Sequence, residues 1–191
     1  RYIMVQTIKG CVWGIILGII LSVVFVLMFD VMSTTVKAQE DIDKYELRLL
    51  GTCKKNKKRR FHFIDRLIDK LEGNIQTPKT IDTSCEYVKE NLEASLDTDQ
   101  ENVILLTGCV DSSVLESYAS ALQKSFETES KITFNYSDCI AKEPETFHKA
   151  KQSTGVILIE EIDKSGNKEV AYEVETFRAL NKDILGFVLM K

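Results

Sequence analysis

The pattern of apolar and polar positions divides the chain into three parts. The first contains an apolar run of 20 residues at positions 10–29, GCVWGIILGIILSVVFVLMF, between Lys9 and Asp30. A helix rises 1.5 Å per residue, so a run of about this length matches a ~30 Å hydrocarbon layer. We therefore expect residues 1–30 to hold a transmembrane helix and its flank. A cleaved signal peptide is the alternative, because VKA at 36–38 resembles a small-x-small cleavage site, but its apolar region is normally only ~7–15 residues long.

Small residues recur at every fourth position of this run, at Gly10, Gly14, Gly18 and Ser22. On a helix they share one face, where the backbone of a second helix can approach closely. Glycine is also common in membrane helices in general. We expect this face to pack against another helix, either of the same protein or of a neighbouring subunit.

The second part, residues 31–77, is predicted to be a juxtamembrane basic segment that ends in a linker. It carries 11 basic and 7 acidic residues, and its densest basic cluster contains Lys54, Lys55, Lys57, Lys58, Arg59 and Arg60. An excess of Lys and Arg marks the cytoplasmic side of a span, so we expect residues 31–191 to be cytoplasmic. Apolar residues then follow at helical spacing from Phe61 to Leu71. This basic amphipathic helix either lies on anionic lipid or packs on the domain behind it.

The third part, residues 78–191, alternates short apolar runs with helical patterns. The runs NVILLTG, KITFNYS, GVILIEEI and DILGFVLM predict buried strands. Apolar stripes predict helices over 84–96, from Ser113 to Phe126 and over about 168–181. Strands that alternate with helices predict an α/β domain with a mostly parallel sheet.

The turn after the first of these strands lies where a phosphate loop would lie. It contains one glycine, one acid and two serines, namely Gly108, Asp111, Ser112 and Ser113. It lacks the G-x-x-x-x-G-K-[ST] pattern, whose glycines let backbone N–H groups wrap the phosphates and whose lysine neutralises them. Asp111 would repel a phosphate, and no Lys or Arg occurs between Lys89 and Lys124. We therefore expect no nucleotide and no other cofactor here, and Ser113 is explained by a capping box with Glu116.

Charge and cysteine usage disfavour further classes of protein. The net charge is −4, and residues 78–191 carry 12 basic and 21 acidic side chains, which disfavours nucleic acid as a partner. Only two histidines accompany five widely spaced cysteines, none of them in a C-x-x-C pair: Cys11, Cys53, Cys85, Cys109 and Cys139. We therefore expect reduced thiols in a cytosolic domain and no metal site.

Candidate catalytic groups are few. Ser112 and Ser113 lack a G-x-S-x-G context. His148 is expected to be a surface residue rather than a base. Glu160, Glu161 and Asp163 follow a strand and could bind a cation, but a solvated strand end is the simpler interpretation.

Three stretches of the chain carry a family resemblance. The glycine-rich apolar run leads into Asp30, Thr35-Val36, Asp41-Ile42 and Leu50-Gly51. CEYVKENLEASL precedes ENVILLTG, and STGVILIEEIDKSGNKEVAYEVETFRALNKDILGFVLMK ends the sequence shown. The chain resembles the family of bacterial polysaccharide co-polymerases, the Wzz-type chain-length determinants, and of capsular and exopolysaccharide tyrosine kinases. The first stretch resembles the last membrane helix of that family and its exit. The second and third resemble the opening of the family's kinase domain and its final strand–helix–strand.

The chain departs from this family at the residues that carry kinase chemistry. Residues 107–117 lack the Gly-Lys-Ser/Thr loop, Asp138 is all that remains of a second Asp-rich strand end, and no tyrosine follows Tyr172. The third, Asp-Pro-Pro-like motif has no counterpart. The resemblance therefore implies a degenerate P-loop-like, tyrosine-kinase-like domain that has lost its nucleotide chemistry.

The resemblance implies a non-catalytic component of capsular or exopolysaccharide biosynthesis in the bacterial cell membrane. Such a protein acts in chain-length control or export, by forming a homo-oligomer and docking on a polysaccharide polymerase, flippase, glycosyltransferase or active tyrosine kinase. The family also has an extracytoplasmic part and a first membrane helix, which would precede Arg1. The alternatives are a divergent nucleotide-binding ATPase or protein tyrosine kinase of the same pathway, and a secreted domain released after Ala38.

Overall fold

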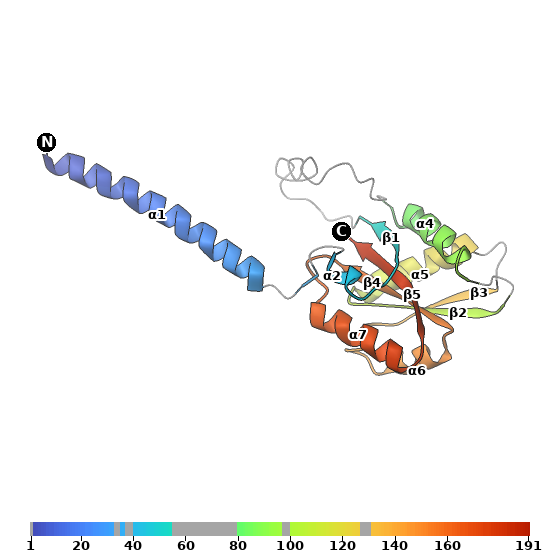
Figure 1. Cartoon of the computed structure of the whole chain (residues 1–191). Helices are drawn as coiled ribbons and strands as arrows, with labels where there is room; N and C mark the ends of the chain where they lie inside the picture. Colours follow the sequence, from blue (N-terminus) through green and yellow to red (C-terminus); the bar gives the residue numbers. More distant parts are fainter. Residues whose placement is uncertain (1, 33–34, 37–39, 55–79, 97–99, 127–130) are drawn as a thin grey trace. The chain divides into compact units, whose positions relative to one another are not determined.

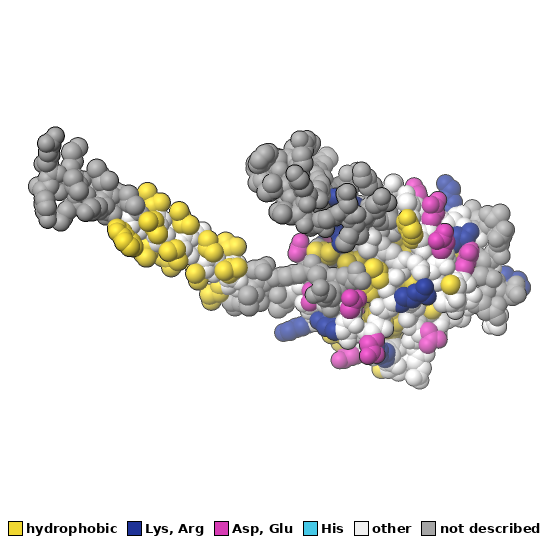
Figure 2. Space-filling model, turned by 45° about the horizontal axis from the view of Figure 1, so that its top comes forward, with side chains coloured by type: hydrophobic (Ala, Val, Ile, Leu, Met, Phe, Trp, Pro, Cys, Tyr) yellow, Lys and Arg dark blue, Asp and Glu magenta, His cyan; other side chains and the backbone are white. Residues whose placement is uncertain are grey.

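The computed structural model describes residues 2–32, 35–36, 40–54, 80–96, 100–126 and 131–191. These residues form two compact units, Arg1–Thr34 and Thr35–Lys191. The first unit contains α1 (Tyr2–Met32), a helix of 31 residues whose side chains are described from 13 to 28. Most of these side chains are apolar and exposed, and they form the yellow stretch of Figure 2. Within the residues whose side chains are described, no helix is both long and apolar enough to span a membrane. The predicted transmembrane helix is therefore without structural support.

The second unit is an α/β domain built on a five-stranded, all-parallel sheet (Figure 1). The strands lie in the order β1-β5-β4-β2-β3. Their bounds are β1 (Leu49–Cys53), β2 (Asn102–Thr107), β3 (Ile132–Tyr136), β4 (Gly155–Glu161) and β5 (Asp183–Met190). The apolar runs of β2, β4 and β5 are nearly continuous because helices cover both faces of the sheet. The α/β class and the parallel sheet predicted from the sequence are thus confirmed.

Two layers of helices enclose the sheet, as Figure 1 shows. α4 (Ile81–Glu93) and α5 (Ser112–Phe126) pack on one face. α6 (Glu145–Gln152), α7 (Asn167–Ala179) and the short α2 (Glu40–Asp43) belong to the other face. The predicted helices over 84–96 and 168–181 correspond to α4 and α7, which begin slightly earlier along the chain.

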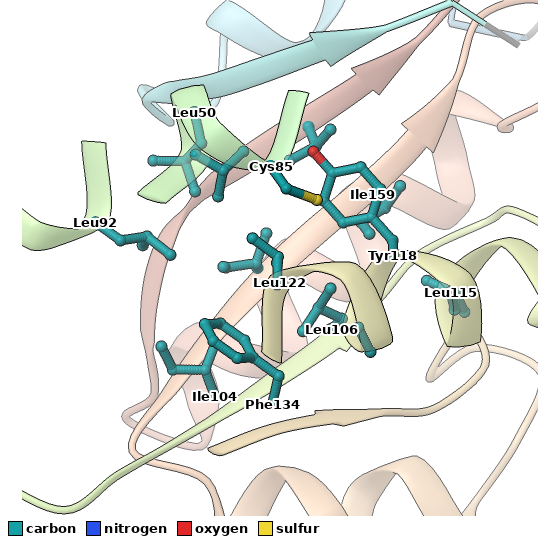
Figure 3. Close-up of a cluster of buried hydrophobic side chains, with 14 of the residues drawn as sticks. Leu50, Cys85, Leu92, Ile104, Leu106, Leu115, Tyr118, Leu122, Phe134 and Ile159 are labelled. Carbon is teal, nitrogen blue, oxygen red and sulfur yellow. The ribbon is translucent and has the colours of Figure 1, made fainter. Parts of the chain in front are cut away.

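The core under α4 and α5 is shown in Figure 3. Leu92 of α4, Leu122 of α5 and Leu106 of β2 are fully buried and belong to one apolar cluster. Tyr118 is also fully buried, and its hydroxyl shares a 2.7 Å hydrogen bond with the hydroxyl of Ser84 on α4. A buried phenol normally needs such a partner, so this bond fixes α4 against α5.

The domain begins before the predicted boundary at residue 78. Val36 and Ile42 are fully buried in the core under α7, and Val36 exchanges backbone hydrogen bonds with Ser165 and Asp163. β1 forms one edge of the sheet and pairs with β5. Part of the segment predicted as juxtamembrane is therefore part of the sheet and its core. Residues 33–34, 37–39 and 55–77 of that segment, and with them the predicted amphipathic helix from Phe61 to Leu71, lie outside the described residues.

β1 is held by close packing at Gly51. A Cβ atom at this position would lie 2.9 Å from Cγ2 of Val88 and 3.3 Å from the Ser84 hydroxyl oxygen, both on α4. The absence of a side chain lets the strand approach the helix. The Leu50-Gly51 pair that carried part of the family resemblance thus lies at a contact between the sheet and α4.

Candidate functional site

The strand order creates a topological switch point at the carboxyl ends of β2 and β4. From β2 the chain crosses to β3 on one side, and from β4 it crosses to β5 on the other. Open α/β sheets bind ligands in crevices of this kind, because the loops leaving the two strands separate there. A pocket of about 430 Å³ lies at this end of the sheet, between the loops that follow β2 and β3. The predicted turn residues Gly108, Asp111 and Ser112 line it.

Gly108 serves the packing of the sheet. Its φ angle is +151°, a conformation that favours glycine. A Cβ atom here would lie 1.9 Å from the carbonyl oxygen of Ile159 in β4. The close approach of the two backbones therefore explains this glycine, and phosphate binding is not needed to account for it.

Asp111 directly precedes α5 and pairs with a lysine from another loop. Its backbone carbonyl accepts the N–H groups of Val114 and Leu115, at 2.8 and 3.3 Å. Its carboxylate lies 2.8 Å from the ammonium of Lys164, in the loop after β4. The predicted Ser113–Glu116 capping box is wrong, because α5 begins at Ser112 and Ser113 lies inside the helix.

The other polar groups of the pocket are linked to one another. The Ser112 hydroxyl donates a hydrogen bond to the Asp138 carboxylate, so the single acid retained after β3 faces the turn after β2. Lys142 lines the pocket, and its ammonium lies 3.3 Å from the carboxylate of Glu169. The described lining residues include three acidic side chains but only this one basic side chain. The acids are Asp111, Asp138 and Glu143. A lining with excess negative charge disfavours the phosphates of a nucleotide.

A buried cluster of two thiols and two carboxyl groups adjoins the pocket. Cys109 follows β2, Cys139 follows β3, Glu160 is in β4 and Glu173 is in α7. The exposed fractions of these four residues are 6%, 2%, 0% and 0%. The Cys109 sulfur lies 3.2 Å from the Cys139 sulfur and 4.0 Å from Oε2 of Glu173. Both cysteines are free thiols.

The two carboxyl groups differ in their hydrogen bonds. Oε1 of Glu173 accepts from the backbone N–H of Ile140 at 3.3 Å and from the Thr107 hydroxyl at 3.4 Å. Oε2 of Glu160 accepts from the Cys109 N–H at 3.4 Å, whereas its Oε1 is buried without a hydrogen-bond partner among the described residues. A buried polar atom without a partner is uncommon and calls for an explanation.

The cluster retains protons near neutral pH. Burial, with the nearby Glu173 carboxyl adding to it, raises the pKa of Glu160 well above its usual range. Burial and the neighbouring Cys139 raise the pKa of Glu173 to about 8. A hydrogen bond from the Cys109 thiol lowers the pKa of Cys139 to about 7, and the same bond with burial raises the pKa of Cys109.

This cluster corrects one interpretation of the sequence and adds a feature that the sequence did not reveal. Glu160 and Glu161 were expected at a solvated strand end, yet both are buried, because α7 and the loops cover the end of β4. Asp163 and His148 are exposed. Cys109 and Cys139 lie far apart in sequence, and only the pairing of β2 with β3 brings them together. Their positions directly after two strands that become neighbours were the only available signal.

The remaining predicted residues lie in α1 or around β1. Gly14, Gly18 and Ser22 are exposed, and a Cβ atom at either glycine would meet nothing within 4 Å. Gly10 lies in α1 where side-chain surroundings are not described. Lys54 directly follows β1, whereas the rest of the basic cluster lies outside the described residues: Lys55, Lys57, Lys58, Arg59 and Arg60. The packing face and the basic cluster stay predictions.

Neither a protein-family model nor a curated protein matches the chain. Among solved structures, the chain is similar to the chimeric protein CapA2B2, with a TM-score of 0.53 and 12% sequence identity. The match covers 80% of this chain and 98% of that one. Identity this low concerns the fold alone, and the shared fold agrees with the α/β domain that the sequence resemblance implied.

Proposed function

We propose that this protein is a non-catalytic component of capsular or exopolysaccharide biosynthesis that acts by assembly and docking. The observation that carries the proposal is the turn after β2, which lies where a phosphate loop would lie. Its one glycine is used in packing against Ile159, and its acid pairs with Lys164. The resemblance of three stretches to capsular co-polymerases and kinases supplies the pathway, and the fold shared with CapA2B2 supports it.

Among the residues that the structure describes, the cations near the pocket are all paired with acids, which disfavours phosphoryl transfer. That chemistry depends on cations that neutralise the charge developing on the phosphate. Lys142 follows β3 and Lys164 follows β4, outside the turn after β2, and each is paired with an acid. Docking needs no such groups, and we propose that the α/β domain docks on a polysaccharide polymerase, flippase, glycosyltransferase or active tyrosine kinase.

We also propose that α1 anchors the protein in the bacterial cell membrane, with the α/β domain in the cytoplasm. The support is the uncharged run at 10–29 and the basic cluster that follows β1. Gly10, Gly14, Gly18 and Ser22 would form the face through which copies of the protein assemble into a homo-oligomer. Polymer length or export would then be controlled by the assembly as a whole.

Nucleotide binding by the full-length protein tests the non-catalytic part. A ligand that binds only the folded state stabilises it by RT ln(1 + [L]/Kd), about 2.7 kcal/mol at 100 times Kd. We expect no change in the midpoint of thermal unfolding with millimolar ATP and Mg²⁺. An increase that disappears in Asp138→Ala would establish the alternative, a divergent ATPase or kinase, because Asp138 lines the pocket.

Cross-linking in native membranes tests the assembly part. We expect Gly14→Leu and Gly18→Leu to reduce the cross-linked oligomer by about tenfold, because leucine at this face separates the helices. Ile16→Leu is the matched control, since it changes an exposed α1 residue outside the small-residue face. An oligomer that survives both glycine substitutions, and a purification that recovers no polysaccharide-synthesis protein, would contradict the proposal.

A further inference from the structure

We propose that Cys109, Cys139 and Glu173 bind a thiophilic divalent metal ion of the zinc class at the inner end of the pocket. The sequence predicted no metal site, because its cysteines form no short motif. The fold changes that expectation by placing ligands from three different elements together. The inference goes beyond the proposed function and does not depend on it.

The spacing of the three ligands suits a tetrahedral ion. The ligand atoms of Cys109, Cys139 and Glu173 all lie within 4.8 Å of one another. The Cys109 sulfur lies 3.2 Å from the Cys139 sulfur and 4.0 Å from Oε2 of Glu173. Ligands about 2.3 Å from a tetrahedral zinc lie ~3.7 Å from each other, between these two values. Small side-chain adjustments would therefore accommodate the ion.

Glu160 provides an independent indication that a ligand is bound here. Its carboxyl is fully buried beside the cluster, where it accepts the Cys109 N–H through Oε2. Its Oε1 has no hydrogen-bond partner among the described residues. An ion held by Cys109 and Glu173 would give this oxygen a partner, either directly or through a metal-bound water. The Glu160 carboxyl is thus the natural fourth ligand or the group that orients it.

The donor set selects the class of metal. Thiolates bind zinc and other soft or borderline ions, whereas magnesium and calcium prefer a shell of oxygen atoms. Two thiolates with one carboxylate are therefore unsuited to the magnesium that accompanies a nucleotide. Three protein ligands also leave one position for Glu160 or water.

Binding exchanges protons for the metal and changes no oxidation state. Two S–H groups and one carboxylic acid lose three protons, and two metal–sulfur bonds and one metal–oxygen bond form. Three ligand charges then surround a dication, so the site carries one net negative charge when water takes the fourth position. Direct binding by the Glu160 carboxylate would release a fourth proton. The released protons reach solvent through the pocket, because Cys109 and Cys139 line its wall. The same opening admits the ion.

Equilibrium dialysis of the full-length, metal-stripped and reduced protein against micromolar Zn²⁺ tests this proposal. We expect one zinc per chain and release of protons on binding. Replacing zinc with Co²⁺ should give the near-ultraviolet absorption of thiolate-to-cobalt charge transfer. Cys109→Ala, Cys139→Ala and Glu173→Gln should each weaken binding by more than about 100-fold, beyond the effect usual for groups that only orient a ligand.

The matched control is Cys85→Ala, which removes a buried thiol from the core on the other face of the sheet. It should bind zinc as the unmodified protein does. Circular dichroism of every variant without metal shows whether it is folded, and Glu173→Gln is the variant that best preserves side-chain volume.

Three results would overturn the proposal. The first is an unmodified protein that binds no zinc at these concentrations, or no more zinc than Cys109→Ala binds. The second is binding that the ligand variants leave unchanged, which would assign it to other cysteines or histidines. The third is a Cys109–Cys139 disulfide in the isolated protein together with no zinc binding after reduction, which would identify the thiols as a redox pair.

Discussion

Replacing Glu173 with glutamine will remove much of the dependence of domain stability on pH between about 4.5 and 7. The pKa of Glu173 is about 8 in the folded domain, because the carboxyl is buried and Cys139 lies beside it, whereas its ordinary value is 4.5. Between these values the folded domain binds more protons than the unfolded chain. Stability from this group is therefore complete below pH 4.5 and is lost as the pH rises toward 8.

The size of the effect follows from linkage. One proton retained only by the folded state changes the free energy of unfolding by 1.36 kcal/mol per pH unit. Over the range from pH 4.5 to 7 this amounts to about 3 kcal/mol. The range stops at 7 because the lowered pKa of Cys139, about 7, has the opposite effect at higher pH. Glutamine resembles the protonated acid, so Glu173→Gln should match the unmodified protein near pH 4.5 and exceed it at pH 7.

Thermal unfolding followed by circular dichroism, with a metal chelator present, measures this difference. For a chain of this size, 3 kcal/mol corresponds to about 6–12 °C in Tm. Glu175→Gln is the control, because Glu175 lies on the same helix but is exposed. Parallel pH profiles for Glu173→Gln and the unmodified protein would refute the claim that the folded domain keeps a proton on Glu173.

Three further substitutions test the packing around the sheet, each measured as the free energy of unfolding in urea. Gly108→Ala should cost about 3 kcal/mol or more, because its methyl group would collide with the Ile159 carbonyl, and a loss below about 1 kcal/mol would contradict this conformation. Phe177→Ala should cost about 3–5 kcal/mol, because the ring is fully buried under the sheet, and a near-neutral result would place it outside the core. Lys164→Ala should cost about 1–2 kcal/mol, because Lys164 pairs with the exposed Asp111 and also with the buried Glu161 carboxylate, and a near-neutral result would show that neither pair stabilises the loop.

The sheet could be predicted in part because its central strands are strongly apolar. β4 and β5 coincide with runs that stand out from the charged sequence around them. β1 could not be found in this way, because LLGTC is short, contains a glycine and lies beside a basic cluster. Its strand conformation is due to pairing with β5 and to contact with α4, and both are tertiary effects.

The candidate site, like the sheet, could be predicted from the sequence only in part. The departure of the turn after β2 from the phosphate-loop pattern was evident from its composition, since no lysine and only one glycine occur there. The cluster of Cys109, Cys139 and Glu173 was not evident, because each ligand comes from a different element. A pattern search detects ligands close together in sequence, whereas this cluster depends on which strands become neighbours.

The pairing of β1 with β5 has a consequence for the order in which the strands of the domain pair during folding. Thr52 lies opposite Leu189, so the first and last strands of the sheet meet side by side. During synthesis β2, β3 and β4 can associate with one another, but β1 must wait for β5 to emerge and fill the place between it and β4. Pairings between such distant segments form slowly. We therefore expect the pairing of β1 with β5 to form later than the pairing of β2 with β3 and β4.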